Sequence, residues 1–269
     1  MGNLLAIGRT AAVFFGYLGF ALIGTVLKVA PFLPKRRRAL YITRFTRHWA
    51  RFSCLVFNIR VRHAGALTPA AGSLIVSNHV GTPDIFILGS CFPAFYVSKA
   101  EIAGWPLFNW MARLGDTIFA DRSKRHQVKS IVAEMTQRLR EGCSVIVFPE
   151  AEATDGRDVI PFKSSPFEAA IRAGRPVQPV TIVYHDGNTP SIACWVETSF
   201  FQHILRLLRN PRLEATAHIL PPVSGETDRR ILAQKCHQLI REVHHRQSAP
   251  RAKSPGPDAR RTQETNNSG

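Results

Sequence analysis

Short apolar runs and helical patterns alternate along most of this chain. The segments 73–79 ("SLIVSNH") and 144–149 ("SVIVFP") contain successive apolar residues, at 74–76 and from 145 onward, which is typical of strands buried on both faces. Further strands are predicted at 58–62, 95–99, 117–121, 176–184, 192–196 and 214–220. Helices are predicted at 104–115, 124–141 and 229–246. This alternation predicts an α/β domain over residues 53–246, with a mixed central sheet flanked by helices.

The N-terminal region is apolar first and basic afterwards. Residues 11–27 carry no charge, and as a helix they are about 25 Å long, against roughly 30 Å for a hydrocarbon core. Residues 35–51 then bring "KRRR" and three more arginines between apolar residues. Because a secretory signal has its main charge before the apolar run, this order favours membrane-anchoring helices over residues 1–52.

We expect a membrane-embedded or re-entrant helix followed by a basic amphipathic helix on an anionic leaflet. By the positive-inside bias, we expect the basic stretch, and with it the α/β domain, on the cytoplasmic side of the inner membrane. The alternative is a buried helix of a soluble protein. At the other end, residues 247–269 lack Leu, Ile, Val, Met and aromatic residues, which predicts a disordered basic tail.

Charge and cysteine content narrow the class of protein. The chain has 35 Lys and Arg against 19 Asp and Glu, and its first 83 residues hold eleven basic residues and no acid. This asymmetry suits an anionic membrane surface as partner. The five cysteines are far apart and form no C-x-x-C, so neither a disulfide framework nor a metal site is predicted, and a reducing compartment fits best.

The candidate chemistry lies where the first buried strand ends. Asn78 and His79 follow that strand, and Asp84, the first carboxylate of the chain, comes five residues later. Each residue has a local explanation, since Thr82-Pro83-Asp84 is a good helix start with Thr82 as N-cap. Strand, turn and helix start also let Asp84 reach His79. An aspartate bonded to one imidazole nitrogen leaves the other free as a base.

The segment "NHVGTPD" resembles the N-H-x-x-x-x-D signature of the glycerolipid acyltransferase family, which includes 1-acylglycerol-3-phosphate acyltransferases. Three further segments follow in the family's order. They are "LGDTIFADR" at 114–122, "VIVFPEAEATDGRDVIPFKSSPF" at 145–167, and "PVQPVTI" at 176–182. The resemblance covers roughly residues 50–220, and the order of the segments makes it more specific than any single motif.

The resemblance implies roles for individual residues. His79 is the general base that takes the proton of the acceptor hydroxyl, and Asp84 orients it. Arg122 binds the acceptor phosphate, and Glu150 organises the acceptor site. Asn78, Lys163 and Pro179 complete the predicted substrate-binding set, with Pro179 shaping the acyl-binding wall. Without the motif order, Arg122 alone is better explained as a solvated arginine beside Asp121.

The third segment departs from the family pattern F-P-E-G-T. Ala151 and Glu152 stand where the family has Gly and Thr. Alanine restricts a turn that glycine permits. Glu152 adds a carboxylate beside Glu150, which repels a phosphate unless Arg157, Lys163 or Arg122 compensates. A zwitterionic acceptor, such as a lyso-ornithine lipid, would suffer less from the extra acid, and reduced activity is a second consequence to consider.

The resemblance therefore implies a membrane-associated O-acyltransferase of phospholipid biosynthesis. The expected reaction moves a fatty acyl group from acyl-ACP or acyl-CoA to a lysophospholipid, 1-acyl-sn-glycerol-3-phosphate giving phosphatidic acid. The alternative acceptor is another lysolipid such as lyso-ornithine lipid. Acyl carrier protein or a CoA thioester is the expected co-substrate, and no other cofactor is predicted.

Two rival hypotheses differ in class. A hydrolase would use Ser77, His79 and Asp84, but no G-x-S-x-G elbow is present. A non-catalytic basic protein would bind anionic membrane or nucleic acid, yet no nucleic-acid-binding motif appears and no nucleic acid is expected. His237, His244 and His245 suggest a metal site less well than a solvated helix face.

Overall fold

The computed structural model describes residues 2–29, 34–67, 72–99, 106–120, 127–188 and 190–248. Its helices are α1 (Gly2–Val29), α2 (Lys35–Val56), α3 (Thr82–Cys91), α4 (Pro106–Leu114), α5 (Gln127–Arg140), α6 (Phe167–Ala173), α7 (Phe200–Arg209) and α8 (Arg229–Ser248). Its strands are β1 (Ile59–Ala64), β2 (Leu74–Ser77), β3 (Ala94–Lys99), β4 (Ile118–Ala120), β5 (Ser144–Val147), β6 (Val177–Tyr184) and β7 (Leu213–Ile219). The tail predicted to be disordered lies outside the described residues, apart from its first two positions.

The strands form one mixed sheet in the order β1-β7-β6-β2-β5-β3-β4. Neighbours are parallel except β6 and β7, which pair antiparallel. This confirms the predicted α/β class with a mixed central sheet flanked by helices. Because β2 and β5 are parallel and central, the segments after both strands emerge at the same edge of the sheet.

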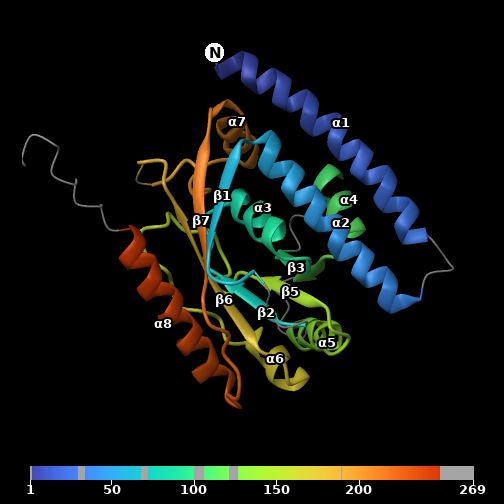
Figure 1. Ribbon diagram of the computed structural model, residues 1–269, viewed down its shortest axis with the longest axis vertical. Coiled ribbons are helices and arrows are strands. Elements are labelled where there is room, and N and C mark those ends of the chain that lie inside the picture. The colour runs from blue at the N-terminus through green and yellow to red at the C-terminus, as the bar shows by residue number, and fades with distance from the viewer. Residues whose placement is uncertain are drawn as a thin grey trace, which may run out of the picture.

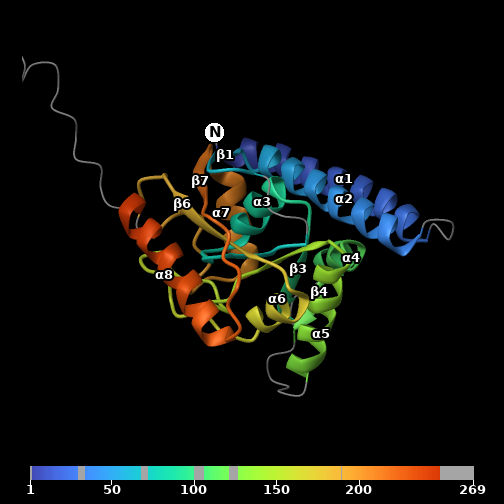
Figure 2. The same ribbon diagram turned by 60° about the horizontal axis from the view of Figure 1, so that its bottom comes forward.

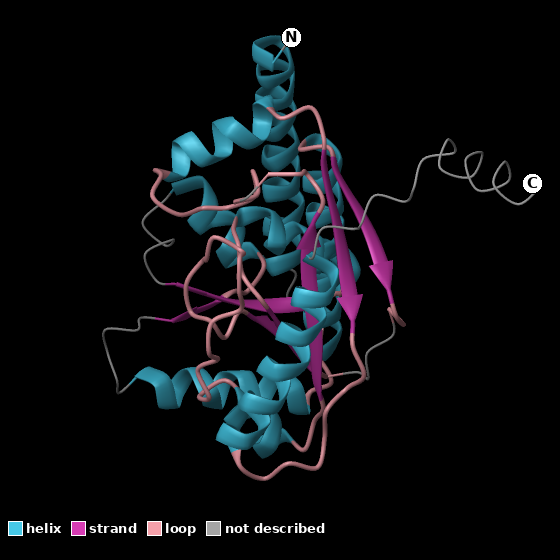
Figure 3. Cartoon of the chain, turned by 90° about the vertical axis from the view of Figure 1, so that its left-hand side faces the viewer, coloured by secondary structure: helices cyan, strands magenta, loops and turns pink. Residues whose placement is uncertain are grey.

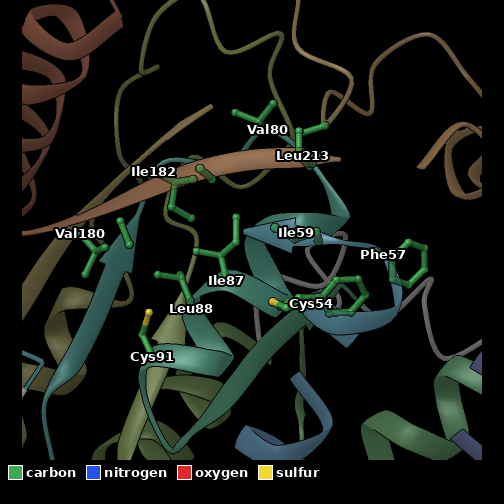
Figure 4. Close-up of a cluster of buried hydrophobic side chains, with 14 of the residues drawn as sticks. Cys54, Phe57, Ile59, Val80, Ile87, Leu88, Cys91, Val180, Ile182 and Leu213 are labelled. Carbon is green, nitrogen blue, oxygen red and sulfur yellow. The ribbon is translucent and has the colours of Figure 1, made fainter. Parts of the chain in front are cut away.

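Alternate residues of the central strands face two separate cores. On one face, Ile75 and Ile146 pack with residues of α2, α3 and α7. On the other, Leu74 and Val145 pack with residues of α5, α6 and α8. Figure 1 shows α8 on the side of the sheet opposite α2, and Figure 3 shows the strands in magenta between the two helical layers. Figure 4 shows the first core, where Ile87 and Leu88 of α3 lie near Ile182 of β6.

The two N-terminal helices pack on each other and on the α/β domain. Tyr17 of α1 bonds Ser53 of α2 through its hydroxyl at 2.8 Å. Arg9 donates to Leu208 O at the end of α7, and Lys28 pairs with Asp116 at 2.8 Å. The helix pair in Figure 2 thus lies along the domain and is tied to it near both ends of α1. The predicted boundary at residue 52 falls inside α2.

One predicted strand is wrong. Residues 192–196 form turns and loop instead. The Asp186 carboxylate accepts the backbone N–H of Ile192 at 2.7 Å, and Trp195 N–H donates to Val80 O at 3.0 Å, so loop contacts occupy these donors. The sequence patterns also did not predict α6 and α7. Helix α3 begins at Thr82 with Gly81, rather than Thr82, at the N-cap position.

Candidate functional site

His79 and Asp84 meet at the edge of the sheet, as the strand–turn–helix pattern predicts. His79 follows β2 and Asp84 lies in the first turn of α3. The Nδ1 atom of His79 lies 2.8 Å from Oδ2 of Asp84. The Asp84 side chain is fully buried, whereas 18% of the His79 side chain is exposed. The imidazole therefore has one nitrogen held by a buried carboxylate, which leaves Nε2 as the atom available to a substrate.

Backbone and side-chain donors surround the Asp84 carboxylate. Its Oδ2 also accepts the N–H groups of Val80 at 2.6 Å and Gly81 at 2.9 Å. Its Oδ1 accepts the hydroxyl of Tyr184, at the end of β6. Gly81 must be small, because a Cβ there would lie 2.1 Å from the carbonyl oxygen of Ala193. The turn between His79 and Asp84 is thus shaped by hydrogen bonds to the carboxylate and by the segment that passes over it.

The ring and backbone of His79 are held by the segment after β5. The imidazole stacks on the Phe148 ring, with centroids 4.1 Å apart. Its backbone N–H donates to Oε1 of Glu150 at 3.0 Å, and its carbonyl accepts the Thr154 N–H at 2.9 Å. Burial raises the pKa of Glu150 to about 8, and the bond from the His79 amide offsets only part of that rise. Glu150 is therefore largely neutral at pH 7.

A cavity of about 600 Å³ adjoins His79. Phe45 and Trp49 of α2, Ile85 and Phe86 of α3, and Met111 of α4 line its apolar wall. Its remaining walls come from β3, from residues 147–153 and from residues 195–200. The volume and the mainly apolar lining fall in the range of small-molecule binding sites, and such a lining suits a hydrocarbon chain.

Both residues that depart from the family pattern lie on this cavity. Ala151 has φ 76°, in the left-handed region that glycine adopts without strain. Glu152 is exposed and also lines the cavity. Because Glu150 is largely neutral, the predicted pair of adjacent negative charges reduces to Glu152 near pH 7.

Three of the remaining predicted residues, Asn78, Pro179 and Lys163, are described by the structure, and none of the three lines the cavity. Asn78 is 3% exposed, and its side-chain amide bonds both the N–H (2.8 Å) and the carbonyl (3.0 Å) of Ile182, which continues the β2–β6 pairing. Pro179 is buried within β6 and pairs with Val76. Lys163 is exposed and is not part of the described lining, although its backbone N–H donates to Pro149 O at 2.8 Å. Arg122 lies outside the described residues.

The structure also bears on the hydrolase hypothesis and on the histidines of α8. Ser77 is fully buried and bonds Asn78 Oδ1 at 3.3 Å rather than His79, which removes support from the hydrolase hypothesis. The predicted solvated face holds for His245, which is exposed, but not for His244, which is 3% exposed; His237 is half-buried and bonds Val159 O at 2.9 Å. Within the described ranges no group of three or more His, Cys, Asp or Glu is arranged to hold a metal ion.

Sequence reasoning missed Tyr184 and the aromatic residues of α2 on the cavity. Tyr184 is the last residue of a strand whose alternation places it on the same face as Ile182. That alternation was a usable signal, but the contact with Asp84 depends on the fold. An imidazole held by a carboxylate beside a hydrocarbon-sized cavity can deprotonate a hydroxyl next to a bound acyl chain.

Comparisons with known proteins agree with this chemistry. A family model described as "Acyltransferase" matches residues 58–183. The lyso-ornithine lipid O-acyltransferase of Pseudomonas aeruginosa is 31% identical over 240 residues, which cover 87% of this chain and 92% of the relative. The 1-acyl-sn-glycerol-3-phosphate acyltransferase of Neisseria gonorrhoeae is 35% identical over 176 residues, which cover 64% and 69%.

A solved structure shares the fold. The crystal structure of the 1-acyl-sn-glycerophosphate acyltransferase PlsC from Thermotoga maritima matches with a TM-score of 0.68 at 18% identity. The match covers 94% of this chain and all of that one. The chain therefore belongs to the acyltransferase family, and it is a lysolipid O-acyltransferase.

Proposed function

We propose that this enzyme transfers a fatty acyl group from a thioester to the hydroxyl of a lyso-ornithine lipid. The observation that carries the proposal is the near full-length similarity to the P. aeruginosa relative, over 92% of its length. The similarity to the N. gonorrhoeae 1-acyl-sn-glycerol-3-phosphate acyltransferase covers 69% of that relative's length. These comparisons favour the acceptor that the sequence analysis ranked second, and 1-acyl-sn-glycerol-3-phosphate is the second candidate.

Glu152 gives a physical reason for this choice. Its carboxylate lies on the cavity that adjoins His79, at the position of the family's threonine. An ornithine headgroup carries an ammonium group, which a carboxylate attracts, whereas a phosphate is repelled. Arg122, two residues beyond β4, stays the proposed partner of the acceptor's anionic group.

The proposed reaction needs one proton carrier. Nε2 of His79 takes the proton of the acceptor hydroxyl as its oxygen attacks the thioester carbonyl carbon. The Asp84 carboxylate stabilises the imidazolium that forms. The C–S bond then breaks, the ester C–O bond remains, and the leaving thiolate takes the proton from Nε2. The acyl chain occupies the cavity between α2 and α3 during these steps.

Glu150 and Asn78 act in this scheme by holding His79. The Glu150 side chain accepts the His79 amide, and Asn78 joins the end of β2 to Ile182. Pro179 and Lys163, predicted to bind substrate, have no described contact with the cavity and are assigned no role in the transfer. Acyl-ACP and acyl-CoA both supply the required thioester.

Helix α1 supports membrane attachment. Residues Gly2–Lys28 are long and apolar enough to cross a membrane, with a mean hydropathy of 1.9 in the most apolar window. Only 17% of that window is buried, unlike the core helix of a soluble protein. We place the enzyme at the cytoplasmic face of the inner membrane, with the basic residues of α2 toward anionic lipid. Flotation of the protein with vesicles tests the role of the basic residues. Stronger flotation with anionic than with neutral vesicles would support it, and equal flotation with both would contradict it.

A competition assay tests the acceptor. The detergent-purified enzyme receives one labelled acyl thioester together with equimolar lyso-ornithine lipid and 1-acyl-sn-glycerol-3-phosphate of the same chain length. The proposal expects the ornithine lipid to be the major labelled product with both acyl-ACP and acyl-CoA. Phosphatidic acid as the major product would overturn it in favour of the second candidate.

A further inference from the structure

We infer that Tyr184 is a positioning residue for acyl transfer, acting on His79 through the carboxylate of Asp84. The Tyr184 hydroxyl donates to Oδ1 of Asp84, while Oδ2 of the same carboxylate holds Nδ1 of His79 at 2.8 Å. The three side chains thus form one chain of hydrogen bonds. This inference rests on the role proposed for His79.

The donors to Asp84 divide unequally between its two oxygens. Oδ2 accepts three bonds, all from residues 79–81 of the turn itself. Oδ1 accepts from Tyr184, which lies 100 residues away on another strand. A carboxylate held at both oxygens cannot rotate about its Cβ–Cγ bond without losing a bond. Tyr184 therefore keeps Oδ2 directed at the imidazole.

The strand that carries Tyr184 is rigidly placed. β6 pairs with β2 on one side and with β7 on the other, and Tyr184 itself is paired with Ala215. Two residues earlier on the same strand, Ile182 binds the amide of Asn78. The end of β6 therefore contacts two residues that flank His79 in the sequence. Ile182 binds Asn78, which precedes His79, and Tyr184 binds Asp84, which follows the turn.

The phenol of Tyr184 is a donor at every pH at which the enzyme works. Burial and the nearby Asp84 charge raise the pKa of Tyr184 well above its ordinary value, so the hydroxyl keeps its proton. A hydrogen-bond donor to one oxygen of a carboxylate stabilises its negative charge, which lowers the affinity of the other oxygen for a cation. Loss of the phenol should therefore make the protonated imidazole persist to higher pH.

Several other titratable residues lie near the hydrogen bonds that join Tyr184, Asp84 and His79, and all variants at position 184 retain them. Those facing Asp84, Tyr184 or the cavity at His79 are Cys54, Tyr96, Glu150, Glu152, Asp186, Cys194 and His203. They come from α2, from β3, from the segments after β5 and β6, and from α7. Comparisons between variants at position 184 hold all of them constant, so a shift between such variants reports on the phenol.

The first test compares Tyr184→Phe with Tyr17→Phe. Tyr17 is also a buried tyrosine with a hydroxyl bond, to Ser53, and it packs behind Trp49 without lining the described cavity or contacting Asp84. For Tyr184→Phe we expect kcat to fall about tenfold with KM nearly unchanged. The acidic limb of the pH–kcat profile should move up by as much as about one pH unit. Tyr17→Phe should keep the kcat and the profile of the natural enzyme.

A second variant keeps the side chain's shape. Replacement of Tyr184 by 3-fluorotyrosine gives a more acidic phenol that donates more strongly, so the acidic limb should move to lower pH. A purely structural role predicts no shift in either direction. Unchanged profiles in both position-184 variants, or shifts of the same sign, would overturn the inference.

The acyl-transfer assay with His79→Ala separates this inference from the proposed function. If His79→Ala retains transfer, the proposed mechanism fails whatever the Tyr184 variants do. If His79→Ala is inactive while Tyr184→Phe behaves like Tyr17→Phe, only the role of Tyr184 fails. In the Asp84→Ala background, Tyr184→Phe should cost less than twofold in kcat, because the side chain that accepts its hydroxyl is already removed. A full tenfold loss in that background would show that Tyr184 does not act through Asp84.

Discussion

The backbone N–H of His79 donates to Oε1 of Glu150 at 3.0 Å, although the two residues are 71 positions apart. The parallel pairing of Val76 with Val147 explains the contact, because each residue of the pair is followed three positions later by His79 or Glu150. The contact joins the first and third motifs of the family in one site. Glu150 therefore acts on the proposed base through its backbone position.

The buried Glu150 should make stability depend on pH. Its pKa is raised from 4.5 to about 8 by burial. Between these values the unfolded chain has released the proton that the folded protein retains. The free energy of unfolding should thus fall as pH rises through this window, by at most about 1.4 kcal/mol per unit. Glu150→Gln should remove this contribution, and urea unfolding at pH 5, 6.5 and 8 measures it.

Activity gives the matching control. Glutamine keeps the carbonyl oxygen that accepts the His79 amide, so Glu150→Gln should retain transfer within a few fold at pH 7. Glu150→Ala leaves that amide without its acceptor and should lose at least tenfold. Equal activity in the two variants would show that Glu150 does not act by holding the His79 amide. The same pH dependence of stability in Glu150→Gln and the natural protein would show that Glu150 does not cause that dependence.

The charge of Glu152 should affect the choice of acceptor. Glu152→Gln removes the charge and keeps the size, while Glu152→Thr restores the residue typical of the family. Both variants should raise the ratio of 1-acylglycerol-3-phosphate to lyso-ornithine lipid used, by several fold, because phosphate repulsion and ammonium attraction are lost together. Product ratios in the competition assay measure this. If both variants keep the ratio of the natural enzyme, Glu152 does not select the headgroup.

Ala151 has a conformation that costs stability. At φ 76° its Cβ crowds the backbone, so Ala151→Gly should raise the free energy of unfolding by about 1 kcal/mol. Replacement of Gly142 by alanine tests the same strain in the opposite direction. Gly142 has φ 82°, and a Cβ added there would meet no atom within 4 Å, so only the backbone conformation would oppose the substitution. Gly142→Ala should therefore lower stability by a similar amount. Denaturant unfolding measures the free energy of unfolding of both variants. A lower value for Ala151→Gly than for the natural protein would contradict the prediction.

Helix α8 holds the segment that carries Glu150 and Glu152. The Arg241 guanidinium bonds both oxygens of Asp158, at 2.8 and 2.7 Å, and holds the pKa of that carboxyl well below its usual value. A lowered pKa contributes stability above the unfolded pKa and loses it as pH falls. Arg241→Met should therefore lower the Tm at pH 6 and flatten its decline toward pH 3.

Arg229→Met is the matched control on the same helix. Arg229 reaches Glu168 only at 3.9 Å, so its loss should leave the Tm and its pH dependence nearly unchanged. If Arg241→Met and Arg229→Met give the same Tm at both pH values, the contact between α8 and Asp158 contributes nothing measurable.

Local sequence patterns predicted the parts of the site that are close in the chain. The turn between β2 and α3 brings Asp84 to His79 within five residues, and the alternation of strands and helices predicted the α/β class. Membership of the acyltransferase family was also predicted, from the order of four motifs. These features depend on nearest neighbours or on linear order, which a sequence displays directly.

Features that depend on tertiary contacts were not predicted. Residues 192–196 have the composition of a strand, yet bonds to Asp186 and Val80 hold them as a loop over Gly81. Tyr184 reaches Asp84 across 100 residues, and the strand alternation that indicates its face does not identify this partner. The raised pKa of Glu150 arises from burial, which follows from packing around the end of β5.

The most direct test of the central claim is the rate of acyl transfer by His79→Ala at saturating donor and lysolipid. The variant removes the imidazole from a partly exposed position, so its Tm should remain close to that of the natural enzyme. A positioned general base contributes about 10²–10⁴-fold, and the account predicts a loss of kcat in that range with donor affinity retained. Transfer by a folded His79→Ala enzyme at more than a tenth of the natural rate would contradict it.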